Sequence, residues 1–152
     1  MNGDAVMKIS TKGRYAIRLM IDIAEHSDGG NVSIKDVAQR QNISIKYLEQ
    51  IVNMLSKTGY LKSQRGSQGG YKMTRLPDEY TVGDILRVTE GDMAPVACLE
   101  DEVNQCPRAK NCPTIGFWTG LYKTINDYLD GTTIADLVRE KEKFNDNYGY
   151  YI

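Results

Sequence analysis

The sequence has no long apolar run and few of the residues that support a disulfide-bonded or secreted protein. No segment approaches the roughly 18 consecutive apolar residues of a membrane span. The first residues, Met1 to Val6, lack the basic and apolar regions of a signal peptide. The cysteines number only three, and an odd number argues against a disulfide framework. These absences predict a cytoplasmic protein that does not contact a membrane.

Enzyme signatures are also scarce. The single histidine, His26, falls at the C-terminal end of a predicted helix, where a cation favours the helix dipole. No glycine-rich substrate-binding motif and no constellation of acid and base residues is visible. The sequence therefore does not predict an enzyme.

The charge of the chain is unevenly divided. The net charge of −1 over 152 residues combines twelve basic and six acidic residues in positions 1–75 with seven basic and fourteen acidic ones in positions 76–152. A basic N-terminal half suits the phosphates of DNA, whereas the acidic half should avoid them.

The stretch from Ser33 to Tyr71 predicts two helices joined by a tight turn and followed by a small hairpin. Ser33 and Ser44 are suitable N-caps, and Leu48, Ile51 and Leu55 recur at the helical period after the second cap. Two short extended runs, residues 60–64 and 70–74, flank a basic, glycine-rich tip. The pattern is that of a winged helix-turn-helix in a mainly α protein with a small β-hairpin wing. The alternative without DNA binding, a small helical core with a solvated charged face, does not explain Arg65 in a glycine-rich tip.

Candidate DNA contacts follow from this arrangement. The start of the second helix of a helix-turn-helix enters the major groove, and the wing lies beside it. An earlier helix, predicted from about Lys12 to Glu25, begins with hydroxyl and cationic side chains that can clamp a phosphate. The predicted contacts are Thr11, Lys12, Arg14, Ser44, Lys46, Tyr47, Glu49, Gln50, Arg65, Ser67 and Gln68.

The C-terminal half predicts helices on either side of an irregular loop. Thr81 caps a helix that ends near Gly91, and a longer helix follows Pro113 and ends at Gly131. The apolar stripe of the longer helix includes Trp118, Leu121 and Ile125, and we expect it to form a homodimer. The predicted parts are a DNA-binding domain over 7–80, a sensor and dimerisation region over 81–143 and a disordered tail over 144–152.

All three cysteines lie in the irregular loop. Seven residues separate Cys98 from Cys106, and five separate Cys106 from Cys112. Soft thiolates favour zinc or iron–sulfur clusters, but the paired short spacings of a structural zinc site are absent. A thiol redox switch is the other alternative from the residues alone.

Three motifs in order carry a resemblance to a known family. They are Lys8 to Ala16, Tyr47 to Gln50, and Arg65 to Tyr71. Together they resemble the Rrf2 family of bacterial transcription regulators, and in particular its regulators of iron–sulfur cluster assembly. The resemblance spans about Met7 to Val138, and it implies double-stranded DNA as partner and a cluster held by Cys98, Cys106 and Cys112.

One position departs from that pattern. The family's cluster-binding regulators have a histidine three residues after the third cysteine, where this chain has Ile115. The fourth ligand remains open among Glu100, Asp101, Glu102, the partner subunit's Asp4 and a small thiol. The number of irons, two or four, is also open.

The interpretation is a transcription regulator that senses iron or cluster status, oxygen or nitric oxide. One alternative is a cluster-free member of the family that responds to thiol oxidation or to a partner protein, as regulators of cysteine metabolism do. Another is a redox enzyme or electron carrier that uses the cluster directly, which would leave the basic wing without a role.

Overall fold

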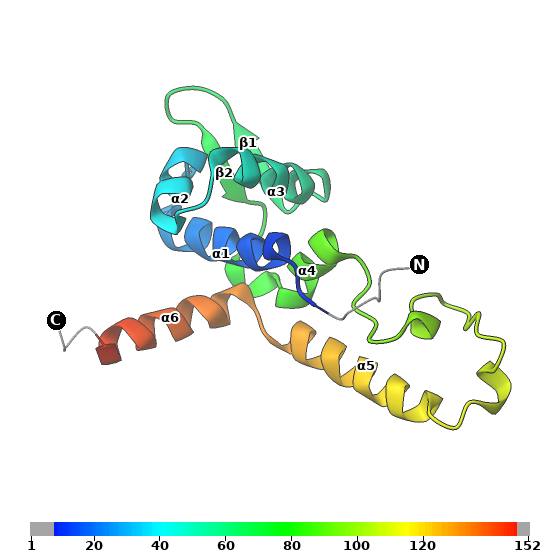
Figure 1. The fold of residues 1–152 in the computed structure, drawn as a ribbon. Helices are drawn as coiled ribbons and strands as arrows, with labels where there is room; N and C mark the ends of the chain where they lie inside the picture. The colour runs from blue at the N-terminus through cyan, green and yellow to red at the C-terminus, as the bar shows by residue number, and fades with distance from the viewer. Residues whose placement is uncertain (1–7, 149–152) are drawn as a thin grey trace.

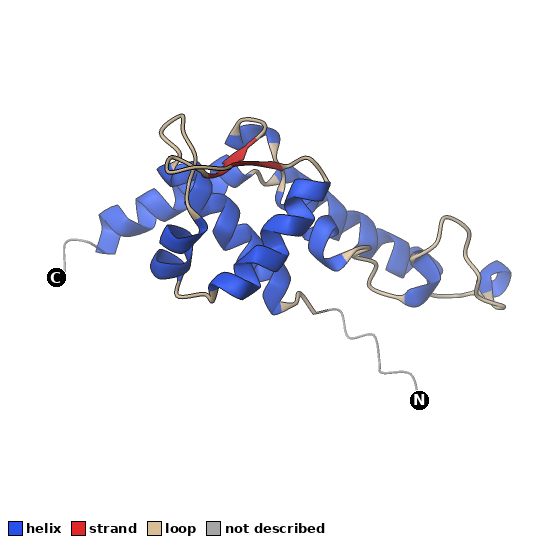
Figure 2. Ribbon diagram, turned by 90° about the horizontal axis from the view of Figure 1, so that it is seen from above, coloured by secondary structure: helices blue, strands red, loops and turns tan. Residues whose placement is uncertain are grey.

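A computed structural model describes residues 8–148 of the chain. Over this range it forms six α-helices and one antiparallel hairpin (Figures 1 and 2), which confirms the predicted fold class. The α-helices are α1 (Thr11–His26), α2 (Ile34–Gln41), α3 (Ile45–Lys57), α4 (Val82–Glu90), α5 (Ile115–Gly131) and α6 (Ile134–Tyr148). The strands are β1 (Leu61–Gln64) and β2 (Gly70–Met73), and the 3-10 turns are η1 (Pro77–Glu79), η2 (Ala97–Leu99) and η3 (Ala109–Asn111).

Side-chain caps set the starts of the helices in the DNA-binding half. Ser10, Ser33 and Ser44 each accept a hydrogen bond from the backbone N–H three residues later, at α1, α2 and α3. Between α2 and α3, Asn42 adopts a left-handed conformation with φ of 54°, which suits a short amide side chain at a helix C-terminus. The tight turn of the helix-turn-helix is therefore built by local chemistry.

One hydrophobic core unites α1, α2 and α3 with the base of the hairpin. Its members include Leu19, Leu48, Ile51 and Leu55, all essentially without exposure to solvent. Tyr80 and Ile134 bring the connector to α4 and the start of α6 into the same core. The DNA-binding half and the last helix are thus packed together.

The wing is a short hairpin with a third, single-residue neighbour. Leu61 pairs with Met73, and the ladder runs to Gln64 opposite Gly70. Val32 exchanges two backbone hydrogen bonds of 2.8 Å with Tyr71. Gly70 has a φ of 144°, and a Cβ there would collide with the Val32 carbonyl, so only glycine suits this crossing. The segment before α2 therefore supports the wing.

Helix α5 extends away from the rest of the protein, and the cysteine loop lies at its far end (Figure 1). None of the residues of α5 is buried in the single chain. The helix begins at Ile115, two residues after Pro113, with Thr114 in the N-cap position. Among residues 8–148, no helix is long and apolar enough to cross a membrane.

Helix α6 extends further than the predicted boundary at residue 143. It begins at a reciprocal cap in which Thr133 and Asp136 exchange hydrogen bonds of 2.9 and 3.0 Å. Lys141 pairs with Glu25 of α1 at 2.6 Å, and the helix continues to Tyr148. Residues 144–148, expected in a disordered tail, are therefore helical, because tertiary contacts with α1 support a segment of weak apolar pattern. Residues 149–152 of that expectation lie outside the described part.

Candidate nucleic-acid interface and cysteine loop

The first turn of α3 presents polar side chains to solvent. Lys46, Glu49 and Gln50 are exposed, together with the cap residue Ser44. On the opposite face, Leu48 is fully buried. The helix is thus held by its apolar side and leaves its polar start free to contact a ligand.

Tyr47 joins the start of α3 to the start of α1. Its ring meets the ring of Tyr15 edge to face, with 5.5 Å between the centroids, and it is half-buried. The Arg18 guanidinium lies 5.2 Å from the centroid of the same Tyr15 ring. Tyr47 therefore has a packing role, and only part of its surface is available to DNA.

The start of α1 carries the second group of predicted contacts. Thr11 and Arg14 are exposed, and an Arg14 Nη2 donates to the Thr11 hydroxyl at 3.1 Å, whereas Lys12 is half-buried. Just before them, both the backbone N–H and the hydroxyl of Ser10 donate to the Glu90 carboxylate at the end of α4. Since Ser10 is so engaged, a phosphate would meet Thr11 and Arg14 first.

The wing residues Arg65, Ser67 and Gln68 are all exposed. Arg65 lines a groove of about 450 Å³ between the wing and the start of α2, whose walls include Ser33 and Lys35. The side-chain amide of Asn31 supports the wing by donating to the Gln64 side chain at 2.8 Å and to the Gln68 carbonyl at 3.2 Å. The sequence analysis did not single out Asn31, because its partners Gln64 and Gln68 lie more than thirty positions away.

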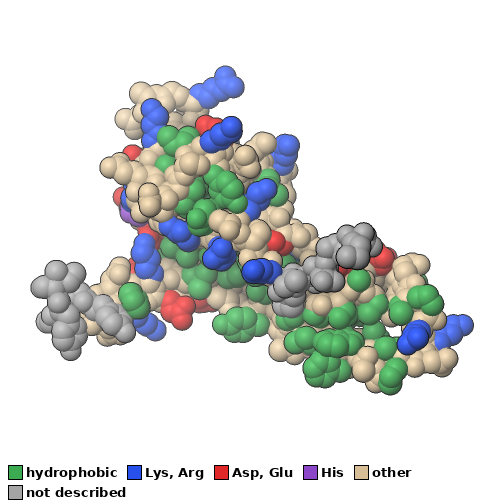
Figure 3. Space-filling model, in the orientation of Figure 1, with side chains coloured by type: hydrophobic (Ala, Val, Ile, Leu, Met, Phe, Trp, Pro, Cys, Tyr) green, Lys and Arg blue, Asp and Glu red, His purple; other side chains and the backbone are tan. Residues whose placement is uncertain are grey.

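The structure therefore places the predicted DNA contacts in two groups. One joins the starts of α1 and α3 through Tyr15 and Tyr47, and the other consists of the wing beside α2. In Figure 3, Lys and Arg side chains are spread over this half of the molecule, whereas hydrophobic side chains gather along α5. The arrangement follows the uneven distribution of charge in the sequence.

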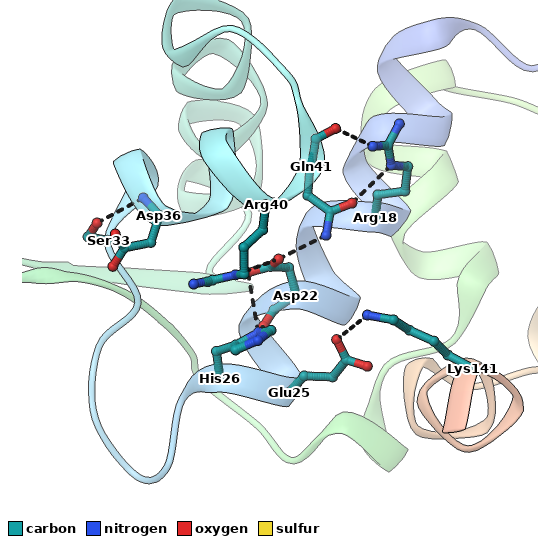
Figure 4. A network of polar contacts seen from close by, with 9 residues as sticks. All are labelled: Arg18, Asp22, Glu25, His26, Ser33, Asp36, Arg40, Gln41 and Lys141. Carbon is teal, nitrogen blue, oxygen red and sulfur yellow. Dashed lines mark hydrogen bonds and ion pairs between the residues drawn. The ribbon is translucent and has the colours of Figure 1, made fainter. Parts of the chain in front are cut away.

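Beneath this surface, a buried carboxylate ties α1 to the helix-turn-helix (Figure 4). Asp22 is fully buried, and Arg40 donates to it from Nε at 3.1 Å and from Nη2 at 2.6 Å. Gln41 adds a bond of 2.8 Å, and His26 Nδ1 lies 3.6 Å away. Burial raises the pKa of Asp22, but these hydrogen bonds and the charges of Arg40 and His26 outweigh it, so the pKa lies below its ordinary value.

Sequence reasoning considered His26 but missed Asp22. A signal was present, because Asp22 stands on the same helical face as the core residues Leu19 and Ile23. A carboxylate at such a position needs a partner. The sequence alone does not say that the partner is Arg40, which lies 18 positions away.

The loop between α4 and α5 holds the three cysteines, all free and half-buried. Cys98 lies within η2, Cys112 directly follows η3, and the backbone N–H of Cys106 donates to the Asn104 side chain at 2.9 Å. Asp92 anchors the start of the loop to α5 by accepting from the Tyr122 hydroxyl at 2.8 Å. The loop is thus attached to α5 at both ends.

The surroundings of Cys112 favour the thiolate form of its side chain. Its Sγ lies 3.5 Å from the Thr114 hydroxyl. This hydroxyl, with backbone N–H groups of Thr114 and Ile115 and the charge of Arg108, lowers the pKa of the Cys112 thiol. Ile115, at the position where the family's cluster-binding regulators have histidine, begins α5 and offers no ligand atom.

The donor chemistry of the loop fits an iron–sulfur cluster, because soft, free thiols are the ligands that such clusters take. The thiols are not gathered, however. Within residues 8–148, no three His, Cys, Asp or Glu side chains are arranged to hold a metal ion. Asp4, one candidate for the fourth ligand, lies outside this range. A cluster would therefore require the loop to close around it.

The apolar stripe of α5 is only partly covered. Trp118, Leu121 and Ile125 are half-buried, and Phe117 and Tyr128 are 67% and 76% exposed. Arg87 of α4 fixes the other side of the helix, with bonds of 2.7 and 3.0 Å to Asp130. The helix is thus tied to α4 by polar side chains, and its apolar side stays partly exposed in the monomer.

Known proteins resemble this chain over nearly its whole length. The sequence profile of the Rrf2 family, described as an iron-dependent transcriptional regulator, matches residues 9–140. The HTH-type transcriptional regulator CymR of Bacillus subtilis is 41% identical over 146 residues, covering 96% of this chain and all of that protein. These relatives are named as transcriptional regulators, in agreement with the prediction that the chain is not an enzyme.

Solved structures agree with the sequence comparison. The structure of B. subtilis CymR, the global cysteine regulator of that organism, matches with a TM-score of 0.72 and 40% identity, covering 88% of this chain and 97% of CymR. The structure of T. potens IscR matches with a TM-score of 0.70 and 39% identity, covering 90% of this chain and 89% of that one. The similarity to the two regulators is nearly equal.

Proposed function

Because this chain belongs to the Rrf2 family of transcriptional regulators, we propose that it is a homodimer that binds operator DNA and carries an iron–sulfur cluster on its three cysteines. The observation that carries the DNA-binding proposal is the first turn of α3. This turn exposes Lys46, Glu49 and Gln50 while the other face of the helix is buried in the core.

The first turn of α3 enters the major groove in this proposal. Lys46 and Gln50 donate to phosphates or base edges, and Glu49 accepts from a cytosine amino group. Arg65 of the wing contacts phosphate or the minor groove, and Thr11 with Arg14 binds a flanking phosphate. Two copies related by a two-fold axis read half-sites roughly one helical turn apart.

The dimer forms through the apolar side of α5. Trp118, Leu121 and Ile125 of one protomer pack against the same helix of its partner, because this stripe is only partly covered within the monomer. Since Arg87 fixes α5 to α4, the spacing of the two recognition helices depends on how the α5 helices cross.

Cys98, Cys106 and Cys112 hold the cluster as thiolates, and the cluster supplies a centre that responds to oxidation and to iron supply. Cys98 lies between α4 and the middle of the loop, and Cys112 lies just before α5. A ligand set that includes both residues joins the ends of these two helices. With a cluster bound, these cysteines would tie α4 to α5 and so favour one arrangement of the dimer, and without it they would leave another arrangement accessible.

The alternative is a cluster-free regulator controlled by thiol oxidation or by a partner protein. It is supported by the nearly equal similarity to CymR, the global cysteine regulator of B. subtilis, and by the separated thiols. Cys112, with its lowered pKa, is the thiol that would react first.

The test uses the full chain purified without oxygen. We expect a brown protein with iron and sulfide in equal amounts, and retention of a defined set of genomic DNA fragments on the immobilised protein. A colourless protein that still retains those fragments supports the alternative. Retention no greater than that of the variant carrying both Lys46→Ala and Arg65→Ala would overturn the DNA-binding proposal.

A further inference from the structure

Tyr80 is a fully buried tyrosine at the junction of the wing with the C-terminal half, with no exposure to solvent. Its hydroxyl donates to the Tyr60 carbonyl at 2.9 Å. It accepts from two backbone N–H groups, those of Thr74 at 3.1 Å and Arg75 at 3.0 Å. The Thr74 hydroxyl also lies 3.0 Å away. Since a phenol hydroxyl offers one donor and two acceptor sites, these neighbours leave none of its sites free.

These bonds lie where the hairpin ladder ends. The last paired residues are Leu61 and Met73, so Tyr60 and Thr74 form the next position outward. There the backbone bond from Thr74 N–H to the Tyr60 carbonyl is 3.3 Å long, and the phenol hydroxyl binds both groups at shorter distances. The side chain of Tyr80 therefore closes the base of the wing.

Aromatic contacts reinforce the same junction. The Tyr60 and Tyr80 rings meet edge to face with 5.4 Å between centroids. The Arg75 guanidinium lies 5.4 Å from the centroid of Tyr60 and 5.8 Å from that of Tyr80. Arg75 thus contacts Tyr80 twice, through its backbone N–H at the hydroxyl and through its guanidinium at the ring.

The backbone of Tyr80 reaches the joint between α5 and α6. Its carbonyl accepts from the N–H of Ile134, the first residue of α6, at 2.9 Å. The following residues continue this contact, because Thr81 bridges with Thr133, and Val82 N–H donates to the Thr132 carbonyl at 2.8 Å. Tyr80 and the two residues after it therefore connect the wing to the joint that directly follows α5.

We infer that Tyr80 is a positioning residue for DNA binding, whose hydroxyl fixes the direction of the wing relative to α5. The inference rests on the proposed function, because it requires the wing to contact DNA. Tyr80 does not touch DNA itself and acts through Arg65. Removal of its hydroxyl leaves the Arg75 N–H without this partner, and it leaves the Thr74 N–H and the Tyr60 carbonyl with their longer backbone bond to each other.

The test compares Tyr80→Phe with Tyr60→Phe, which is a matched control because the Tyr60 hydroxyl makes none of these bonds. Hydrogen exchange should become faster at the amides of Thr74 and Arg75 in Tyr80→Phe and stay unchanged in Tyr60→Phe. Affinity for the operator, measured by fluorescence anisotropy on protein whose circular dichroism shows it folded, should fall about tenfold in Tyr80→Phe only.

A double-mutant cycle with Arg65→Ala separates positioning from general stability. If Tyr80 acts through the wing, Tyr80→Phe causes no further loss of affinity once Arg65 is absent. An equal loss in both backgrounds, or wild-type affinity in Tyr80→Phe, would overturn the inference while the proposed function stands. A wild-type protein that binds no DNA would overturn both, and this result is distinct from the other two.

Discussion

Glu49 stands exposed in the first turn of α3 and offers hydrogen-bond acceptors but no donor. At a base edge it therefore selects for the cytosine amino group. We expect Glu49→Ala to change which base is preferred at one operator position, with about 1–3 kcal/mol of discrimination lost. Binding to a panel of single-base operator variants measures this. Asn53→Ala, one turn further along the exposed side of α3, serves as control. If Glu49→Ala shows the same base preference as this control, base recognition lies elsewhere.

Arg65 differs from Glu49 because a phosphate contact carries no base preference. We expect Arg65→Ala to weaken binding to all sequences and to reduce the slope of log affinity against log salt concentration by about one. Lys57→Ala, which removes an equal charge at the far end of α3, should leave the slope unchanged. DNA titrations at several salt concentrations measure these slopes. Equal slopes for wild type and Arg65→Ala would show that the wing tip is not part of the DNA interface.

Asp22 makes a pH-dependent contribution to the free energy of unfolding. Its pKa is lower in the folded protein than in the unfolded chain, so its stabilisation is complete above the unfolded pKa of about 3.9 and is lost as pH falls through the folded pKa. Asp22→Asn should cost about 2–4 kcal/mol at neutral pH, because Arg40 keeps a charge without its partner.

Urea unfolding at several pH values checks this, with the exposed Asp78→Asn as control. The stability gap between wild type and Asp22→Asn should narrow as the pH is lowered below about 4. A gap independent of pH would show that the variant loses packing rather than an ionised carboxylate.

Among the elements, α5 is tied to α4 by polar side chains, and its apolar side stays partly exposed. Leu121→Asp or Ile125→Asp should give monomers, since each places a carboxylate in the apolar interface. Thr119→Asp adds the same charge to the opposite side of the helix and should remain dimeric. Sedimentation velocity distinguishes the two species. If the Leu121 and Ile125 variants both stay dimeric, the stripe belongs to another contact.

The same elements show how far the sequence determines the fold. Local signals predicted the starts of α2, α3 and α4, because Ser33, Ser44 and Thr81 each bond a backbone N–H within three residues. The length of α6 was not predictable, because it depends on Ile134 entering a distant core and on Lys141 meeting Glu25. Asp22 and Tyr80 were missed for the same reason, since their partners are brought together only by the folded chain.

At the scale of the whole molecule, the uneven charge and the separate motifs predicted a DNA-binding half and a sensor half. The chain belongs to a family of transcriptional regulators, and the division of roles between the two halves stays a prediction. The sequence identified the three candidate thiols, but it did not show that they are not gathered at one site in the folded chain over residues 8–148. The separation of the thiols has a local reason, because Cys98 and Cys112 lie at different short turns of the loop, η2 and η3. The loop is fixed at its ends by Asp92 and by the start of α5.

The cysteine loop joins α4 to α5, so substitutions of the cysteines test whether a change in the loop alters DNA binding. We expect Cys98→Ala, Cys106→Ala and Cys112→Ala each to lose the cluster and to keep the fold and the dimer, because the thiols contribute little to the core. Binding to some DNA should survive with altered affinity or site choice, since the recognition residues are unchanged. Assembly in the wild type should weaken as pH falls, because the ligands must be thiolates.

Anaerobic reconstitution of the wild type and the three variants measures these effects, with iron, sulfide and visible absorption determined for each and operator affinity compared before and after loading. Ser56→Ala, which changes a small side chain of α3 far from the loop in sequence, controls for handling. Iron without sulfide would indicate a plain metal site. A variant that keeps the full cluster would remove only its own cysteine from the ligand set. A wild type that never takes up iron would contradict the cluster proposal and leave the alternative, control by thiol oxidation or by a partner protein.

In that case, operator affinity that changes on oxidation in the wild type but not in Cys112→Ala would assign the response to this thiol, in agreement with the pKa that Thr114 lowers.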